Sequence, residues 1–192
     1  MPMSRPKKRR TSVGPKLVLG YRISFSLMLA VLLIGCAGAP EIRGTDPQSL
    51  LSAGDFHFLK EDYSQARENY GNLKRLYPDH PEVPRVQYQI AMSYFNEMKP
   101  CDRDQTFTKL ALASFEYIVN NYPAYENQAR NKIGFCKKRL ADQEFYIGIF
   151  YYDQGRYKAA YQRFGGLLDK YPDDPDRQKT LYYFFKSWRK LQ

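Results

Sequence analysis

Side chains that could act as nucleophiles or metal ligands are few, because the 192-residue chain has three cysteines and two histidines. This supply is small for a zinc cluster or a metal site built from histidines. Asp173 and Asp174 stand between two prolines, which is typical of a turn and helix cap rather than of a general acid and base. No nucleophile beside a base stands out in the sequence. We therefore expect no catalysis, no metal and no cofactor, and Cys36 is the residue to which we assign covalent chemistry.

Cys36 follows a segment typical of a secretion signal. Four consecutive basic residues, Lys7–Arg10, come before a 13-residue apolar run, Ile23–Gly35. As a helix, this run would be about 20 Å long, too short for the roughly 30 Å core of a bilayer. Residues 33–36, Leu-Ile-Gly-Cys, resemble a bacterial lipobox, in which the cysteine thiol takes a diacylglyceryl group as a thioether and becomes the first residue of the mature chain. An ordinary signal peptide and an uncleaved anchor remain alternatives.

The leader predicts a division of the chain into a signal peptide over 1–35, a lipidated tether over 36–46 and a helical repeat domain over 47–192. By resemblance to sorted bacterial lipoproteins, Ala37 rather than Asp after the cysteine implies the outer membrane, with the domain facing the periplasm. Several acyl chains on Cys36 would hold the protein to the bilayer. A disulfide is compatible with that oxidising compartment. Nothing in the spacing of Cys101 and Cys136 brings them together, so we expect both thiols to be unpaired.

The basic residues are concentrated in the leader. The chain has 30 Lys and Arg against 20 Asp and Glu, a formal net charge of +10. Seven of the basic residues and none of the acidic ones lie in residues 1–35, so residues 36–192 carry 23 basic and 20 acidic residues, a net charge of +3. Binding to a phosphate backbone needs a concentrated basic face. We therefore expect no nucleic-acid partner.

Every Tyr-Pro dipeptide in the chain ends the same pattern of Ala, an aromatic residue, an aliphatic residue and Tyr-Pro at offsets 0, 4, 7 and 11. The three copies are Ala66, Tyr70, Leu73 and Tyr77-Pro78; Ala111, Phe115, Ile118 and Tyr122-Pro123; and Ala160, Phe164, Leu167 and Tyr171-Pro172. These offsets share one face of a helix. Since proline restricts the residue before it and lacks an N–H, each helix is expected to end at the Tyr-Pro.

A second helix is expected before each of these. Gly54 and Gly148 lie 12 residues before the Ala of their copies, and Ala91 lies 20 residues before Ala111. Small residues at this spacing resemble the tetratricopeptide pattern, in which each repeat is a pair of antiparallel helices. Because small residues are needed where two helix backbones approach, these positions mark the contact within each pair.

Two insertions and two ends complete the predicted fold. We place eight extra residues in a polar loop over 98–105, and a second insertion over 126–140 as a lengthening of one helix to around 28 residues. Asp46-Pro47 is a start signal for the first helix, and an apolar stripe of Leu181, Phe184, Phe185 and Trp188 indicates a last helix over 176–190. The prediction is an all-α solenoid of about seven antiparallel helices.

Three pieces of sequence point to a family. They are Cys36 in its lipobox; Tyr-Pro-Asp-His-Pro at 77–81 with Gln-Tyr-Gln-Ile-Ala-Met-Ser-Tyr at 87–94; and Arg-Asp-Gln-Thr at 103–106 with Arg-Leu-Ala-Asp-Gln-Glu at 139–144. Together they resemble the BamD (ComL) family, lipoproteins of the outer-membrane β-barrel assembly machinery, over about residues 50–190. The resemblance implies a non-enzymatic adaptor that docks on the barrel insertase, beside accessory lipoproteins, and helps deliver unfolded outer-membrane proteins.

In this family the N-terminal repeats are associated with clients and the C-terminal repeats with the insertase. First helices line the inner surface of a solenoid, which makes a groove for a peptide. We expect client contact from four side chains on such helices: Phe58, Tyr88, Met92 and Phe95. For the insertase we expect contact from three charged residues of the third repeat: Asp153, Arg156 and Arg163. Core packing of the first set and simple solvation of the second remain alternatives.

Other function classes are less well supported by the sequence. A cell-wall hydrolase would need a positioned nucleophile or two carboxylates in a cleft. A pilot lipoprotein of a pilus secretin would share the lipid and the repeats, but the Arg-Asp-Gln-Thr insertion at 103–106 argues against it. A second envelope adaptor of this kind is the alternative to the assembly role.

Overall fold

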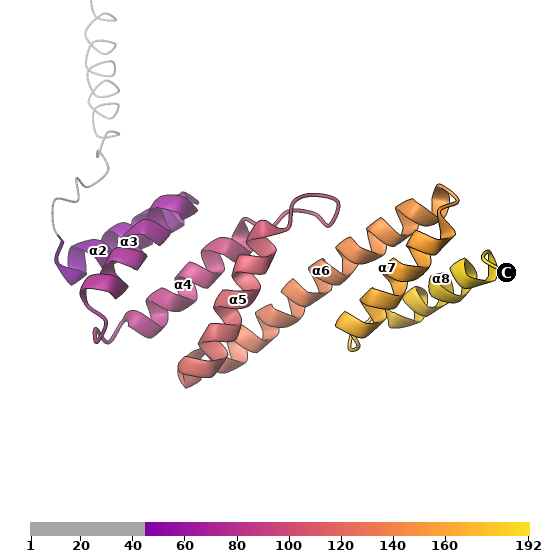
Figure 1. Cartoon of the computed structure of the whole chain (residues 1–192). Helices are drawn as coiled ribbons and strands as arrows, with labels where there is room; N and C mark the ends of the chain where they lie inside the picture. The colour runs from indigo at the N-terminus through magenta and orange to yellow at the C-terminus, as the bar shows by residue number, and fades with distance from the viewer. Residues whose placement is uncertain (1–44) are drawn as a thin grey trace, which may run out of the picture. The chain divides into compact units, whose positions relative to one another are not determined.

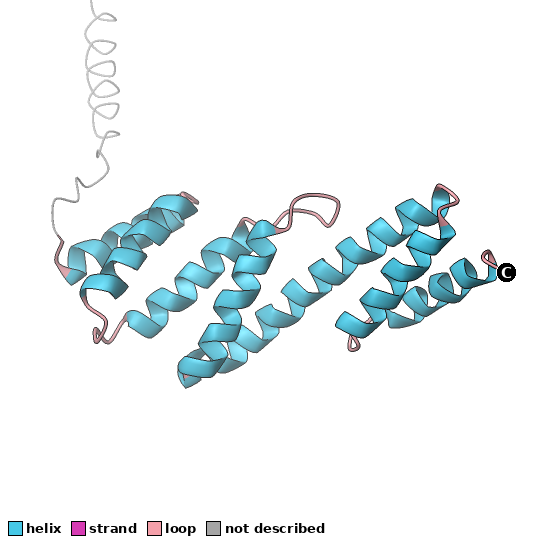
Figure 2. Cartoon of the chain, in the orientation of Figure 1, coloured by secondary structure: helices cyan, strands magenta, loops and turns pink. Residues whose placement is uncertain are grey.

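The computed structural model describes residues 45–192, and every regular element within this range is helical (Figures 1 and 2). The elements of this range are α2 (Pro47–Leu59), α3 (Tyr63–Leu76), α4 (Val83–Asn96), α5 (Thr106–Asn121), the 3-10 helix η2 (Pro123–Tyr125), α6 (Glu126–Asp153), α7 (Tyr157–Lys170) and α8 (Arg177–Arg189). The seven described α-helices confirm the predicted fold class. The signal peptide, the tether up to residue 44 and Cys36 lie outside the described residues.

The helix ends follow from the local sequence. Asp46 caps α2 by accepting a hydrogen bond from the Ser49 N–H at 3.0 Å, with proline in the first turn. The helices α3, α5 and α7 each stop at the tyrosine of a Tyr-Pro dipeptide, as predicted. The N–H of that tyrosine still donates to the carbonyl four residues earlier, at 2.8 Å for Tyr77 and Tyr122 and 3.0 Å for Tyr171. The following proline cannot continue this pattern.

Helices that are neighbours in the chain pack against each other in antiparallel fashion (Figure 1). The small residues of the repeat lie where paired helices come closest. Gly148 of α6 faces the ring of Phe164 on α7, and a Cβ at this glycine would lie 2.5 Å from the Phe164 Cε1. Gly54 of α2 faces the Tyr70 ring of α3 in the same way. The predicted alternation of small and aromatic residues thus sets the spacing of these helix pairs.

Two clusters of buried apolar side chains join successive pairs. The first, over α2, α3 and α4, consists of Leu50, Leu51, Ala66, Tyr70, Leu73, Val83 and Val86. The second, over α4, α5 and α6, consists of Ala91, Ala111, Phe115, Ile118, Ala129 and Cys136. Each cluster contains one complete copy of the predicted Ala, aromatic and aliphatic pattern. The residues of the Tyr-Pro repeat therefore form the core.

Charged groups add specific ties between the first three helices. Arg85 of α4 donates two hydrogen bonds to Asp55 of α2, at 3.0 and 3.1 Å, and the Tyr70 hydroxyl donates to the same carboxylate at 2.6 Å. Burial, together with the hydrogen bond to Asp55, raises the pKa of Tyr70 above its ordinary value. Paired hydrogen bonds between guanidinium and carboxylate fix orientation as well as distance, so these three groups define how α4 sits on the first pair.

Both predicted insertions are found where the sequence placed them. The loop between α4 and α5 covers residues 97–105, and α6 is one continuous helix of 28 residues. No proline lies in α6, and the helix continues through Gly134 where the second insertion lies. Its first part packs against α5 and its last part against α7, so one helix belongs to two repeats.

Candidate functional site

Three of the four side chains predicted to touch a client lie together on α4. Tyr88 stacks on Tyr125 of η2, with ring centroids 5.1 Å apart, and meets Phe115 edge to face at 5.9 Å. Phe95 also meets Phe115, at 6.1 Å. Met92 packs against the same second cluster, and all three side chains are half-buried. Their main contacts are therefore within the core, and their exposed edges are the parts open to a client.

Phe58 is separate from these three. It lies on α2, is half-buried, packs against the first cluster and meets Tyr63 edge to face at 5.4 Å. Helix α6 partly covers Phe95, because the ammonium of Lys132 on α6 lies 4.3 Å from the Phe95 ring centroid. A client contact at all four residues stays a prediction, and it would involve two patches rather than one.

The three residues predicted to touch the insertase are all exposed. Asp153 ends α6, and Arg156 precedes α7 with its guanidinium 4.7 Å from the Tyr151 ring centroid. Arg163 lies further along α7 and donates to Glu144 of α6 at 3.0 Å. A pair this exposed contributes little to stability, so both arginines are available for contact. Their role at an insertase stays a prediction.

The Arg-Asp-Gln-Thr stretch has a clear structural role. The Gln105 side chain is buried, and its amide donates to the carbonyls of Pro100 and Arg103 at 2.7 and 3.0 Å. Its own carbonyl accepts from the Thr108 hydroxyl at 2.7 Å. One glutamine thereby satisfies the polar groups of the 97–105 loop and attaches the loop to α5. Gln105 of the Arg-Asp-Gln-Thr stretch is thus the anchor of the inserted loop.

Arg67 of α3 links the first two repeats on a partly buried surface. It donates to the Ser93 hydroxyl at 3.2 Å and pairs with Glu97, both on or just after α4. Its guanidinium also lies over two aromatic rings, 4.5 Å from the Tyr94 centroid and 5.7 Å from that of Phe107. An arginine stacked on rings and paired with a carboxylate is held in one orientation, so it is a structural tie.

The cysteines of the described range differ in environment. Both are free thiols, with Cys101 in the inserted loop and Cys136 buried in the second cluster, 3.9 Å from the Met98 sulfur. Burial raises the pKa of Cys136 from 9.0 to about 12. Cys136 therefore acts as an apolar core residue rather than a nucleophile. His57 lies 3.3 Å from the Asp62 carboxylate, which holds it at the end of α2.

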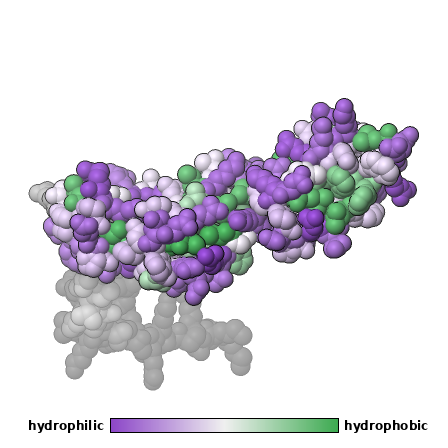
Figure 3. Space-filling view, turned by 60° about the horizontal axis from the view of Figure 1, so that its bottom comes forward, coloured by the Kyte–Doolittle hydropathy of each residue, from purple (hydrophilic) through white to green (hydrophobic). Residues whose placement is uncertain are grey.

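The last helix presents an aromatic surface that the sequence did not predict. The apolar stripe divides: Leu181 and Phe184 are half-buried, whereas Phe185 and Trp188 are 56% and 46% exposed. The most buried residues of α8 are instead Thr180 and Ser187. Their hydroxyls donate to the backbone carbonyls four residues earlier, those of Asp176 and Tyr183. Figure 3 shows apolar side chains gathered toward this C-terminal end as well as in the middle of the row.

The exposed aromatics of α8 share the helix and its C-terminal end with five cations, of which Lys186 lies 5.3 Å from the Tyr182 ring centroid. We call this surface the α8 face; its residues are Tyr182, Phe185, Trp188 and Leu191 with Arg177, Lys179, Lys186, Arg189 and Lys190. Residues 177–192 contain no acidic side chain. Exposed aromatic and arginine side chains are the types that carry most binding energy at interfaces. The α8 face therefore has the composition of a docking surface for an acidic partner.

The described residues contain neither a metal-binding cluster nor a membrane-spanning helix. Among residues 45–192, no three His, Cys, Asp or Glu side chains lie close enough together to hold a metal ion. None of the helices from α2 to α8 is both long and apolar enough to cross a membrane.

Similarity to known proteins covers the same range. Residues 46–192 match the YfiO family, described as an outer membrane lipoprotein. The outer membrane protein assembly factor BamD of Caulobacter vibrioides is 29% identical over 143 residues, covering 73% of this chain and 47% of that protein. The BamD of Rickettsia prowazekii is 28% identical over 147 residues, covering 76% and 59%. The chain thus spans about half the length of these curated relatives.

Among solved structures, the MamA protein is 16% identical, with 75% of this chain and 91% of MamA covered, at a TM-score of 0.31. At this score the two structures are not similar enough to identify the fold, and the all-α class follows from the described helices. The family match, in contrast, extends over most of the chain and over all seven described α-helices. The chain therefore belongs to the YfiO family of outer membrane lipoproteins, which confirms the BamD-type family predicted from its motifs.

Proposed function

We propose that this protein is a lipid-anchored adaptor of the β-barrel assembly machinery, held at the outer membrane and facing the periplasm. The observation that carries the proposal is its similarity to assembly factors named BamD over 143 and 147 residues, together with the family match over residues 46–192. In this role it docks on the barrel insertase, beside accessory lipoproteins, and helps deliver unfolded outer-membrane proteins. It supplies surfaces rather than catalysis and uses no cofactor.

The arrangement of helices suits such a role. Stacked helix pairs form extended binding surfaces without a catalytic cleft. The N-terminal half would contact clients through the exposed edges of Phe58, Tyr88, Met92 and Phe95. The C-terminal half would contact the insertase through Asp153, Arg156 and Arg163, together with the α8 face. Cations around exposed aromatics favour an acidic apolar patch on the partner, because complementary charge selects the partner and speeds association.

The anchor in this proposal is Cys36. Two or more acyl chains bind a bilayer firmly, whereas one chain binds only marginally. Between the lipid and α2 stand residues 36–46, which span at most about 40 Å when extended. Such a tether lets the helical domain reach periplasmic partners while it stays at the membrane surface.

Co-purification from detergent-solubilised outer membranes tests the assembly role. The full-length protein with a C-terminal affinity tag, expressed in its native host, is expected to recover a β-barrel insertase, identified by mass spectrometry. Arg156→Glu is expected to lower the recovered insertase several-fold, because the reversed charge meets the same partner surface. Lys109→Glu, at an exposed residue of α5, is the matched control and should leave recovery unchanged. Recovery of a secretin without an insertase would show that the assembly role is wrong.

The client surface needs its own test. A photo-crosslinking amino acid at Met92 should capture an unfolded barrel protein, whereas the same probe at Glu68, an exposed position on α3, should not. Equal crosslinking at both positions would remove the proposed client contact and leave the insertase contact untouched.

A further inference from the structure

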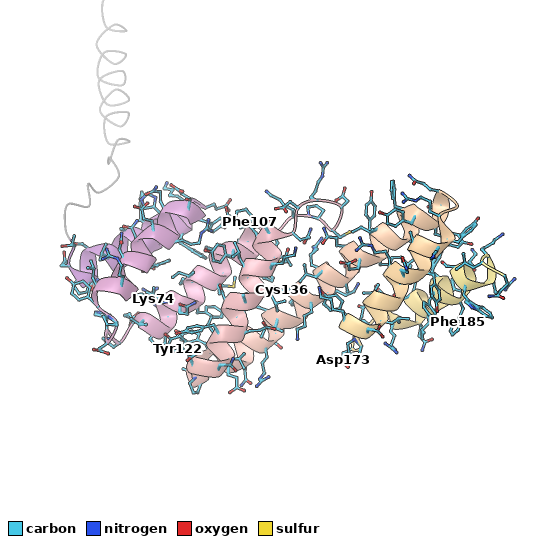
Figure 4. The ribbon with its side chains drawn as sticks, in the orientation of Figure 1. Lys74, Phe107, Tyr122, Cys136, Asp173 and Phe185 are labelled. Carbon is cyan, nitrogen blue, oxygen red and sulfur yellow. The ribbon has the colours of Figure 1, made fainter. Side chains whose placement is uncertain are left out.

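A pocket lies between the middle of α6 and the turn that joins α7 to α8. It has a volume of about 490 Å³ and its walls are mostly apolar. From α6 it is lined by Phe135 and Ala141, and from the turn by Tyr171, Pro172 and Pro175. Phe135 is 64% exposed, so its ring is open to an occupant. Figure 4 labels Asp173 at this turn, below the long α6 helix.

One carboxylate in the lining has no hydrogen-bond partner. The Asp174 side chain is 6% exposed, and its Oδ1 atom is buried without a donor. A buried charged group without such a partner is costly. An unsatisfied buried group in a native structure calls for an explanation, and a role in binding is one such explanation. Asp174 is therefore a candidate for binding.

Local structure does not explain this carboxylate. In the first repeat the corresponding position is His80, in Tyr-Pro-Asp-His-Pro, and its Nδ1 accepts a hydrogen bond from the Glu82 N–H at 3.2 Å at the start of α4. In the third repeat no side chain caps α8. The turn at Asp174 is made by its backbone, whose N–H donates to the Tyr171 carbonyl at 3.1 Å. The Asp174 side chain thus lacks the turn hydrogen bond that His80 makes.

The negative charge of Asp174 is also poorly balanced. Its nearest cation is Lys138, with Nζ 3.9 Å from Oδ1. The same ammonium already bonds to Asp176 at 2.7 Å and pairs with Asp142. Burial opposes the charge on Lys138, but its bonds to Asp142 and Asp176 outweigh burial and raise its pKa, so it stays protonated. One ammonium therefore serves three carboxylates, and the other lysines of the lining, Lys137 and Lys170, are exposed to solvent.

The chemistry of the pocket selects its occupant. A guanidinium is planar, stacks on aromatic rings and donates several hydrogen bonds to a carboxylate. The ring of Phe135 with a buried carboxylate offers both kinds of contact, whereas the Tyr171 ring already carries the Lys170 ammonium, 5.3 Å from its centroid. A lysine ammonium is a compact, strongly hydrated charge, and a tyrosine hydroxyl would satisfy the hydrogen bond but leave the charge unbalanced. An arginine side chain stacks on a ring, donates hydrogen bonds to the carboxylate and balances its charge.

We propose that this pocket is a docking site for an arginine side chain of a partner protein, with the guanidinium on Asp174 and stacked beside Phe135. The apolar walls would take neighbouring apolar residues of the same segment. The site adjoins Phe95, whose ring meets that of Phe135 edge to face at 6.3 Å, and it does not depend on the identity of the machinery that the protein serves.

Fluorescence anisotropy of labelled peptides tests the site on the full-length protein in detergent. The probe is a blocked heptapeptide with one central arginine between leucines. A peptide with citrulline in its place keeps the shape and most donors but has no charge. We expect the arginine peptide to bind about tenfold more tightly than the citrulline peptide, which corresponds to about 1.4 kcal/mol. Asp174→Asn should abolish that preference, whereas Asp169→Asn, at an exposed residue of α7 outside the lining, should keep it.

Two further results bear on the proposal. A tyrosine or lysine peptide that binds as tightly as the arginine peptide would overturn the choice of occupant, and so would a preference that survives Asp174→Asn. Urea unfolding of Asp174→Asn supplies the second measurement. We expect its midpoint to be unchanged or higher, because the variant removes a poorly balanced buried charge. A clear fall in the midpoint would show that the carboxylate stabilises the fold and would contradict its assignment as a binding group.

Discussion

The close contact between α6 and α7 predicts opposite effects of the same substitution at two glycines of one helix. Gly148 faces the fully buried ring of Phe164. A methyl group there would lie 2.5 Å from Cε1 and 2.8 Å from Cζ, whereas carbon atoms pack best at about 3.5–4.0 Å. The ring cannot easily withdraw, because Phe145 and Tyr183 flank it at centroid distances of 5.6 and 5.8 Å. Gly148→Ala therefore overpacks the core.

Gly134 supplies the matched control. It lies in the same helix, and a Cβ built on it meets nothing within 4 Å. Replacing an interior helix glycine by alanine stabilises a helix by about 1 kcal/mol, and this gain applies to both variants. Overpacking costs about 1–3 kcal/mol and applies to Gly148→Ala alone. We therefore expect the free energy of unfolding of Gly148→Ala to lie about 2 kcal/mol below that of Gly134→Ala.

Urea unfolding followed by circular dichroism measures this difference. Gly134→Ala should raise the midpoint above that of the original protein, Gly148→Ala should lower it, and the slope with urea should stay the same. Two variants with equal, raised midpoints would refute the idea that small residues set the spacing between α6 and α7. The tetratricopeptide interpretation of the glycine spacing would then lose its physical basis.

Three other outcomes follow from single residues. Gln105→Ala should cost about 1–2 kcal/mol of stability, since it removes hydrogen bonds to two loop carbonyls, and limited proteolysis should show faster cleavage in the 97–105 loop. Mass spectrometry after brief alkylation should find Cys101 modified before Cys136. Burial raises the pKa of Cys136 from 9.0 to about 12, so this thiol ionises at a lower pH in the unfolded chain than in the folded one. Its contribution to the free energy of unfolding should therefore fall as the pH rises from 9.0 to about 12. Cys36→Ser should leave the chain without acyl groups and release it from the membrane fraction, and an acylated variant would contradict the lipobox interpretation.

Local sequence determined the features that were predicted correctly. The end of each second helix depends on a Tyr-Pro dipeptide, and the start of α2 depends on Asp46 and Pro47, all of which act over one or two turns. The 28 residues of α6 were predictable because helical spacing continues through 126–140 without a breaker. The glycine contacts were predictable because a small residue opposite an aromatic one is needed wherever two helices cross closely.

Features that depend on the next repeat were not predictable in the same way. Tyr88 and Phe95 are apolar whether they face a groove or a core, and only the placement of α5, η2 and α6 shows that they pack inward. The division of the α8 stripe has a similar cause, because Thr180 and Ser187 are small enough to lie at the contact with α7 while their hydroxyls bond within their own helix. Hydrophobicity alone therefore misidentified the buried face of α8.

The length of α6 connects the inserted sequence to the proposed arginine pocket. A helix of 28 residues is about 42 Å long, so the helix pair that follows packs on its far end, where Gly148 meets Phe164. The near end is covered by α5 around Ala129 and Cys136. Between these two contacts the helix meets the turn before α8, through Lys138 and Asp176 at 2.7 Å, and the inserted loop, through Gln143 and the Arg103 carbonyl at 3.4 Å. Phe135 and Lys138 lie within the inserted stretch 126–140, so the insertion that lengthens the helix also supplies much of the α6 wall of the pocket.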